Sequence, residues 1–200
     1  MADTKITGLS TDTAPDAADV FPFVDVSAAT TEKVTYANMV PKADVSATNT
    51  GTSATSLVTP DGLAGSYAGT ESVTVEVFAA ATALATGDGK KYFKLPSTVN
   101  GMNLVAVSAS VFAKSTSGNP TVMLARGRQA NATTAHAYVD MLSTALTIDA
   151  NDFDSKDAGT PAVINGSNDD VLTGDMVRVD VDTAGTAATG LFVTLEFRLP

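Results

Sequence analysis

Gly174-Asp-Met-Val-Arg-Val-Asp-Val-Asp-Thr183 and Gly190-Leu-Phe-Val-Thr-Leu-Glu-Phe-Arg-Leu199 are the two stretches that decide the fold of this chain. Both alternate apolar and polar residues, the period-two pattern of a β-strand with one dry and one wet face. The apolar rows are Val177, Val179 and Val181, then Leu191, Val193, Leu195, Phe197 and Leu199; Arg178, Asp180 and Asp182 take the wet face of the first strand. Shifting either strand by one residue would expose its apolar row, so the register is well specified. We expect two strands joined by a turn at 183–190, with the C-terminal residues held in the core.

Cysteine and histidine usage narrows the chemistry open to these 200 residues. The length suits one large or two small domains with a real core. The chain has no Cys, which excludes disulfides, cysteine-based metal sites and thiol redox chemistry. His136 is the single histidine, so a Ser-His-Asp mechanism would depend wholly on it. No nucleophile motif accompanies His136, and we interpret it as a surface or satisfied side chain.

The charge balance bears on possible partners. The formal net charge is −10 and the pI is near 4.3. Phosphate contacts need clusters of Lys and Arg, so we expect no binding to nucleic acid or to an anionic membrane. No apolar run approaches the roughly 20 residues that span a bilayer, and residues 1–9 lack the apolar core of a secretory signal. We therefore expect no membrane insertion, and synthesis and folding in a cytoplasm.

Further β-patterned segments follow one another from residue 72 onward, separated by turn residues. They cover residues 73–77, 91–95, 102–113, 121–126, 136–142 and 145–148. In the longest we expect Val105, Val107 and Val111 on one face and Ser108 and Ser110 on the other. We interpret residues 87–90 as a hairpin turn and Asn100-Gly101 as a turn pair. About eight strands at regular spacing predict an all-β fold: an antiparallel β-sandwich of jelly-roll type over residues 71–200.

Residues 1–70 have a different character. Strands are expected at 20–26 and 32–35, with one turn of helix at 36–40, and we take residues 1–40 as one segment. Residues 45–56 are small and polar without an apolar period, which predicts that 41–70 is a linker. An ordered arm laid over a neighbouring subunit is the alternative for this stretch. A unit of about 40 residues buries too little surface to be secure alone, so residues 1–40 should fold against a partner or another copy.

The order of residues in the N-terminal segment supports a family resemblance. It runs Ile6-Thr-Gly-Leu9, Asp12 to Pro15, Asp19-Val-Phe-Pro22, Val24-Asp25 and Thr31-Glu-Lys-Val-Thr-Tyr-Ala-Asn-Met39. This order resembles the N-terminal segment of tailed-bacteriophage fibre and appendage proteins. Glu32 stands where that family usually has a second basic residue beside Lys33. The later stretches, among them Phe93-Lys-Leu-Pro96, Asp140-Met-Leu-Ser143 and the closing pair of strands, are similar to the β-sandwich domain of tailed-phage structural proteins.

The resemblance implies a function. It predicts a non-enzymatic virion structural protein, with residues 1–40 as a virion anchor and the β-sandwich projecting as a homotrimer. We favour a capsid decoration protein or short head fibre, whose partners are further copies of the chain and the major capsid protein or another virion protein. Its location is then the virion, after synthesis in the host cytoplasm. The expected anchoring residues are Ile6, Leu9, Phe21, Phe23, Val34 and Met39.

The acidic loop and the tight arginine pair are the polar groups that could bind an ion or a partner. The acidic loop 149–170 offers oxygen atoms for Ca²⁺, in the sets Asn151, Asp152, Asp154 and Asp157 or Asn165, Asn168, Asp169 and Asp170. EF-hand spacing is not met, so a solvated loop with Asx-type turns is the preferred interpretation. Arg126-Gly-Arg128 is the only tight arginine pair, suited to acidic groups on a partner. We expect no catalytic residue, no metal site and no cofactor.

Two other functions remain open. A tail fibre or receptor-binding appendage would contact a host surface glycan or protein through exposed loops such as 115–120 or 149–170. A glycan hydrolase would need a pair of carboxylates whose separation only a structure defines. The chain has many aspartates for such a pair but few glutamates. The glutamates are Glu32, Glu71, Glu76 and Glu196.

Overall fold

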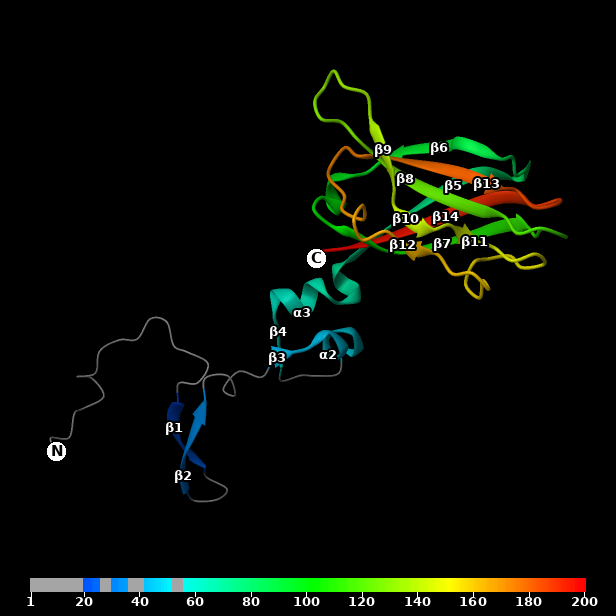
Figure 1. The fold of residues 1–200 in the computed structure, drawn as a ribbon. Coiled ribbons are helices and arrows are strands. Elements are labelled where there is room, and N and C mark those ends of the chain that lie inside the picture. The colour runs from blue at the N-terminus through cyan, green and yellow to red at the C-terminus, as the bar shows by residue number, and fades with distance from the viewer. Residues whose placement is uncertain (1–19, 26–29, 36–41, 52–55) are drawn as a thin grey trace. The chain divides into compact units, whose positions relative to one another are not determined.

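The computed structural model describes residues 20–25, 30–35, 42–51 and 56–200, and the chain divides into two units, residues 1–63 and 64–200 (Figure 1). In the first unit, β1 (Val20–Asp25) and β2 (Thr30–Thr35) form an antiparallel hairpin. The strands expected near these positions are therefore present. The predicted helical turn at 36–40 lies outside the described residues.

Two short helices lie in the stretch predicted as a linker. β3 (Lys42–Ala43) pairs in parallel with β4 (Leu57–Val58), and α2 (Val45–Thr50) and α3 (Pro60–Ala64) follow these strands. Asp44 caps α2, its Oδ1 accepting from the Ala47 N–H at 2.7 Å. Gly51 ends α2 in the left-handed conformation with φ of 62°, which glycine adopts without steric cost. The caps explain a helix that the missing apolar period did not predict.

The second unit consists mainly of two antiparallel sheets. The five-stranded sheet contains β6 (Gly87–Lys94), β13 (Met176–Thr183) and β8 (Thr121–Arg128), with β9 (Ala137–Asp140) and β11 (Leu146–Thr147) both paired to β8. The three-stranded sheet has the order β5 (Thr70–Ala83), β14 (Thr189–Arg198) and β7 (Asn103–Ala113). β10 (Leu142–Thr144) and β12 (Val163–Ile164) form a small third sheet, and single 3₁₀ turns lie at η2 (Tyr67–Gly69) and η3 (Ser97–Val99).

The chain crosses between the two main sheets with each consecutive strand from β5 to β8. The last two strands then enter the middle of the sheets, β13 between β6 and β8, and β14 between β5 and β7 (Figure 1). This wrapping is that of a jelly roll. The predicted all-β class and the sandwich are confirmed; the two main sheets together contain the eight strands expected, and the small sheet of β10 and β12 brings the total for this unit to ten. The turn after β13 does not close a paired hairpin, because it carries the chain from one sheet to the other.

The core lies between the two sheets and contains most of the predicted apolar rows. The side chains of these rows that are 0% exposed are Val177, Val179, Val181, Leu191, Val193, Leu195 and Phe197. Full burial of such a side chain contributes about 1.5–3 kcal/mol. Leu199 is 45% exposed and follows the end of β14, so its predicted place in the row is wrong.

Asp180 shares a face of β13 with Arg178, as predicted, but it is buried there and not solvated. Its residue is only 3% exposed, although its neighbours Arg178 and Asp182 are more accessible. The Gly89 N–H donates to Asp180 Oδ1 at 2.7 Å, and Arg178 donates to Oδ2. Gly89 belongs to β6, so residues 87–90 form a strand and not the predicted hairpin turn. β5 and β6 belong to different sheets, which excludes a hairpin between them.

A β-bulge reverses the predicted faces at the start of β7. Phe197 of β14 pairs with Leu104 and Glu196 pairs with Ala106, which leaves Val105 as the extra residue. Leu104 is consequently 2% exposed in the core, and Val105 is 36% exposed. The prediction that Val105 shares a face with Val111 is wrong because the bulge interrupts the period-two pattern.

No helix of the described residues is long and apolar enough to cross a membrane.

Candidate functional site

The arginine pair lies at the end of β8. Because side chains alternate along a strand, Arg126 and Arg128 continue the inward row of Val122 and Leu124. Arg126 is 8% exposed, with its Nε buried and without a hydrogen-bond partner among the described residues. A charged pair at the end of a core row needs carboxylates beside it, since burying an unpaired charge is costly.

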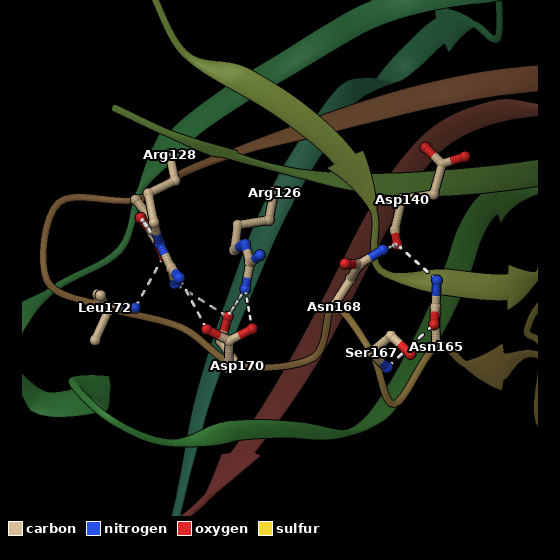
Figure 2. A network of polar contacts seen from close by, with 9 residues as sticks. Arg126, Arg128, Asp140, Asn165, Ser167, Asn168, Asp170 and Leu172 are labelled. Atoms are coloured by element: carbon tan, nitrogen blue, oxygen red, sulfur yellow. Dashed lines mark hydrogen bonds and ion pairs between the residues drawn. The ribbon is translucent and has the colours of Figure 1, made fainter. Parts of the chain in front are cut away.

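Two aspartates from the segment between β12 and β13 meet these arginines (Figure 2). Arg128 donates from Nε to Asp175 Oδ1 at 3.0 Å and from Nη2 to Oδ2 at 2.6 Å, a bidentate arrangement. Its Nη1 donates to Asp170 Oδ2 at 2.8 Å. Arg126 donates through Nη1 to the carboxylate and the backbone carbonyl of Asp170. We call these four residues the arginine clasp.

The electrostatics of the arginine clasp favour the charged forms. Hydrogen bonding to Asp175 raises the pKa of Arg128 above its ordinary value, against the opposing effect of burial. Burial by itself would raise the pKa of Asp170, but the hydrogen bonds from Arg128 and Arg126 outweigh it and hold that pKa below the usual range. The arginines predicted to meet acidic groups on a partner are therefore engaged within their own chain.

The arginine clasp holds one end of the acidic loop 149–170 through Asp170. Asn165 and Asn168 donate through their side-chain amides to the Asp140 carbonyl at 3.3 and 3.0 Å, and the Ser167 N–H donates to Asn165 Oδ1 at 3.2 Å (Figure 2). The last contact is an Asx turn, the preferred interpretation of this loop. At the other end, Asp154 accepts from the Lys156 N–H at 2.8 Å. Among the described residues, no group of three or more His, Asp or Glu side chains is placed to hold a metal ion.

His136 belongs to an aromatic cluster on the outer face of the five-stranded sheet. Its ring lies 6.1 Å from that of Tyr138, and Tyr138 lies 6.2 Å from Tyr92 in an edge-to-face arrangement. The Arg178 guanidinium lies over Tyr138, 4.9 Å from the ring centroid. Burial raises the pKa of Tyr138, and the nearby Tyr92 raises it further by a smaller amount. Tyr92 is 51% exposed, so the cluster presents an accessible aromatic ring beside charged groups.

A groove follows the edge of β7 that faces away from β14. Backbone bridges join this edge to other segments at Asn103 with Asp170 and at Ser110 with Asp154. Between them, residues 105–108 pair with no other described strand on that side. A cavity of about 480 Å³ lies here, adjoined at Ser108 by one of about 340 Å³. The larger cavity is lined mostly by apolar residues, including Val105, Pro161, Val163 and Ile164.

The predicted anchoring residues lie in the first unit. Phe21 and Phe23 belong to β1 and Val34 belongs to β2, with Phe21 and Val34 opposite each other in the hairpin. Ile6, Leu9 and Met39 lie outside the described residues. Sequence reasoning did not single out Asp175 or Asp180, because an aspartate in a turn or on an alternating strand looks solvated. The signal that could have pointed to Asp175 was the pair Arg126 and Arg128, because two arginines at the end of an apolar row need acidic partners.

Comparison of the chain with protein-family models, with curated proteins and with solved structures finds no match.

Proposed function

We propose that this chain is a non-enzymatic structural protein of a tailed-phage virion. In this role it serves as a capsid decoration protein or short head fibre, anchored by its N-terminal segment and projecting a trimeric β-sandwich. Its partners are two further copies of itself and the major capsid protein or another virion protein. The proposal extends the resemblance of residues 1–40 and of the β-sandwich stretches to phage structural proteins.

The observation that carries the proposal is the division of the chain into two units of different kinds. A β-hairpin and two short helices precede a jelly roll that has its own continuous core. An isolated two-stranded hairpin is at best marginally stable in water. A hairpin attached to a stable domain therefore suits a segment that becomes ordered on a shell, and repeated weak contacts from an oligomer would strengthen such attachment.

The charged groups of the jelly roll favour a structural role over catalysis. Arg126, Arg128 and Arg178 form ion pairs with aspartates of the same unit. Their visible effect is to hold loops and strands together. Asp175 and Asp180, the most buried of these carboxylates, each accept hydrogen bonds on both oxygens, from arginine and from backbone N–H groups.

Immunogold electron microscopy of intact particles tests the proposal. An antibody raised against the jelly roll should label the head of the particle. Label confined to the tail tip or baseplate would replace the decoration role by host recognition. Absence of label from purified particles, with the protein detected only in the lysate, would refute a virion protein altogether.

A receptor-binding tail appendage is the second candidate, and the aromatic cluster favours it. Tyr92 is exposed and lies opposite Arg178 in the pairing of β6 with β13, and the charged groups of Arg178 and Asp88 are 3.7 Å apart. An aromatic face next to hydrogen-bonding side chains is suited to stack on a sugar ring of a host glycan. Purified protein would then compete with phage for adsorption to host cells, and Tyr92→Ala would abolish that competition. If the Tyr92→Ala variant competed as well as the wild type, the aromatic cluster would have no part in adsorption.

A further inference from the structure

We propose that residues 42–51 and 56–63 form the surface through which copies of this chain associate with one another. The inference rests on the oligomer in the proposed function and gives it a location. We call residues 42–51 and 56–63, which contain β3, α2, β4 and most of α3, the association segment. The occupant of its apolar surface is the same segment of another copy.

The association segment has hydrogen-bonded structure without a core of its own. Each of its large apolar residues is exposed: Val45 by 40%, Leu57 by 61%, Val58 by 52% and Leu63 by 47%. Among its described residues, only Ala43 and Gly62 are buried. The jelly roll differs sharply, since its strands direct their apolar rows into a closed core. Apolar side chains gathered in this way mark an interaction surface.

The backbone of the segment is organised nevertheless. Asp44 and Gly51 cap the two ends of α2, and the Gly62 N–H donates to Thr59 Oγ1 at 3.1 Å. Gly62 also approaches β3 closely, because a Cβ at this position would lie 2.9 Å from the Ala43 carbonyl oxygen. Isolated helices shorter than about 12–15 residues are marginal in water. Helices of six and five residues therefore need their apolar faces covered to persist.

The charges of the segment favour another copy as the covering partner. The segment contains one lysine and two aspartates, against a net charge of −10 for the whole chain. Association through this nearly neutral surface avoids much of the repulsion between acidic domains. Asp44 is engaged in its cap, whereas exposed Lys42 and Asp61 form no ion pair with a described residue. When identical copies associate, an ion pair between them needs a positive and a negative group on the same chain. Lys42 of one copy can therefore meet Asp61 of the next.

Sedimentation of the full chain at micromolar concentration tests the inference. The double variant Leu57→Glu/Val58→Glu should sediment as a monomer, while the wild type sediments at three times that mass. The replaced side chains are exposed within the chain, so the melting of the jelly roll, followed by circular dichroism, should not change. The matched control is Phe112→Glu/Val163→Glu in the jelly roll, at residues that are 66% and 50% exposed. The control should keep the mass of the wild type.

Two further variants make the test specific for this surface. Because the chain has no Cys, a single Leu57→Cys should give a disulfide-linked dimer on oxidation, whereas Phe112→Cys should not. Lys42→Glu should weaken association several-fold, and adding Asp61→Lys to it should restore association.

The outcomes separate the inference from the proposed function. Retention of the wild-type mass by Leu57→Glu/Val58→Glu would overturn the association segment, as would dissociation caused only by the jelly-roll control. A monomeric wild type would overturn both the segment and the trimer. The virion role is decided independently by the immunogold label, so either proposal can fail while the other stands.

Discussion

Arg128 holds the carboxylate of Asp175 through two hydrogen bonds, of 3.0 Å to Oδ1 and 2.6 Å to Oδ2, and the Asp175 side chain is only 4% exposed. The pair joins the end of β8 to the turn that leads into β13, across 47 residues of sequence. The Leu172 N–H also donates to the same carboxylate at 2.9 Å. These hydrogen bonds hold the turn that precedes β13 against the end of β8.

Arg128→Ala should lower the free energy of unfolding by about 2–3 kcal/mol, because it leaves Asp175 buried without its cation; the partial exposure of Arg128 moderates the loss. Arg128→Lys should recover part of the loss, since Lys cannot form the bidentate pair. Urea denaturation measures both. Lys91→Ala, at an exposed position of β6, is the control and should change little. A loss no larger than that of the control would contradict the role assigned to the clasp.

Gly127→Ala should destabilise the jelly roll by about 1–3 kcal/mol through overpacking. Gly127 lies opposite Tyr138 in the ladder, and a Cβ would come within 2.6 Å of the tyrosine ring. In the background of Tyr138→Ala, the same substitution should cost much less. Gly166→Ala is the matched control, because nothing lies within 4 Å of its Cβ position. Thermal denaturation of the four proteins and the wild type gives the comparison, and equal losses in both backgrounds would argue against contact with the ring.

Leu104→Ala should cost about 2–5 kcal/mol, as expected for a leucine removed from a core. Val105→Ala should cost less than about 1 kcal/mol, since the bulge directs Val105 outward. Chemical denaturation of the two variants distinguishes them. The reverse order of losses would show that the regular alternation of the sequence continues through residue 105 and that the bulge is absent.

Asp170 should contribute to stability above pH 4 and lose that contribution in acid. Its pKa in the folded chain lies below its ordinary value of about 3.9, so the unfolded chain binds the proton more readily. The stabilisation is complete above the unfolded pKa and disappears as pH falls through the folded pKa. Asp170→Asn should therefore be less stable than the wild type at pH 7, with the difference shrinking toward pH 2. A pH-independent difference in unfolding free energy would contradict this linkage.

Asp182→Asn should have the opposite effect near neutrality. Burial raises the pKa of Asp182, and Asp180, Asp88 and Asp140 raise it further. A carboxyl group with a raised pKa in the folded state destabilises that state when ionised, above the folded pKa, and this effect is absent below the unfolded pKa. The variant should gain about 0.5 kcal/mol at pH 7, a small figure because the residue is exposed, and nothing at pH 3. Asp157→Asn is the control on an exposed loop residue. Equal gains from both variants, or a loss from Asp182→Asn, would contradict the prediction.

Local periodicity predicted much of the jelly roll. Val177, Val179 and Val181 alternate with polar residues, and so do the apolar residues of 191–197, because each strand faces the core on one side only. The period-two pattern gives the wrong environment where a distant part of the chain decides it. The bulge at Val105 depends on pairing with Glu196 and Phe197, which lie about 90 residues later in the chain. Burial of Asp180 likewise depends on Gly89 of another strand.

By itself, the sequence determined the all-β class, the approximate number of strands, the faces of the last two strands and the exclusion of cysteine chemistry. These follow from residue types and from spacings within single segments. Only the tertiary structure decided that β13 and β14 enter the middle of different sheets, and that Arg126 and Arg128 meet Asp170 and Asp175. The physical reason is that strand partners and ion-pair partners are chosen by the path of the chain between sheets. That path depends on closing one core from all the strands together, and no single segment contains this information.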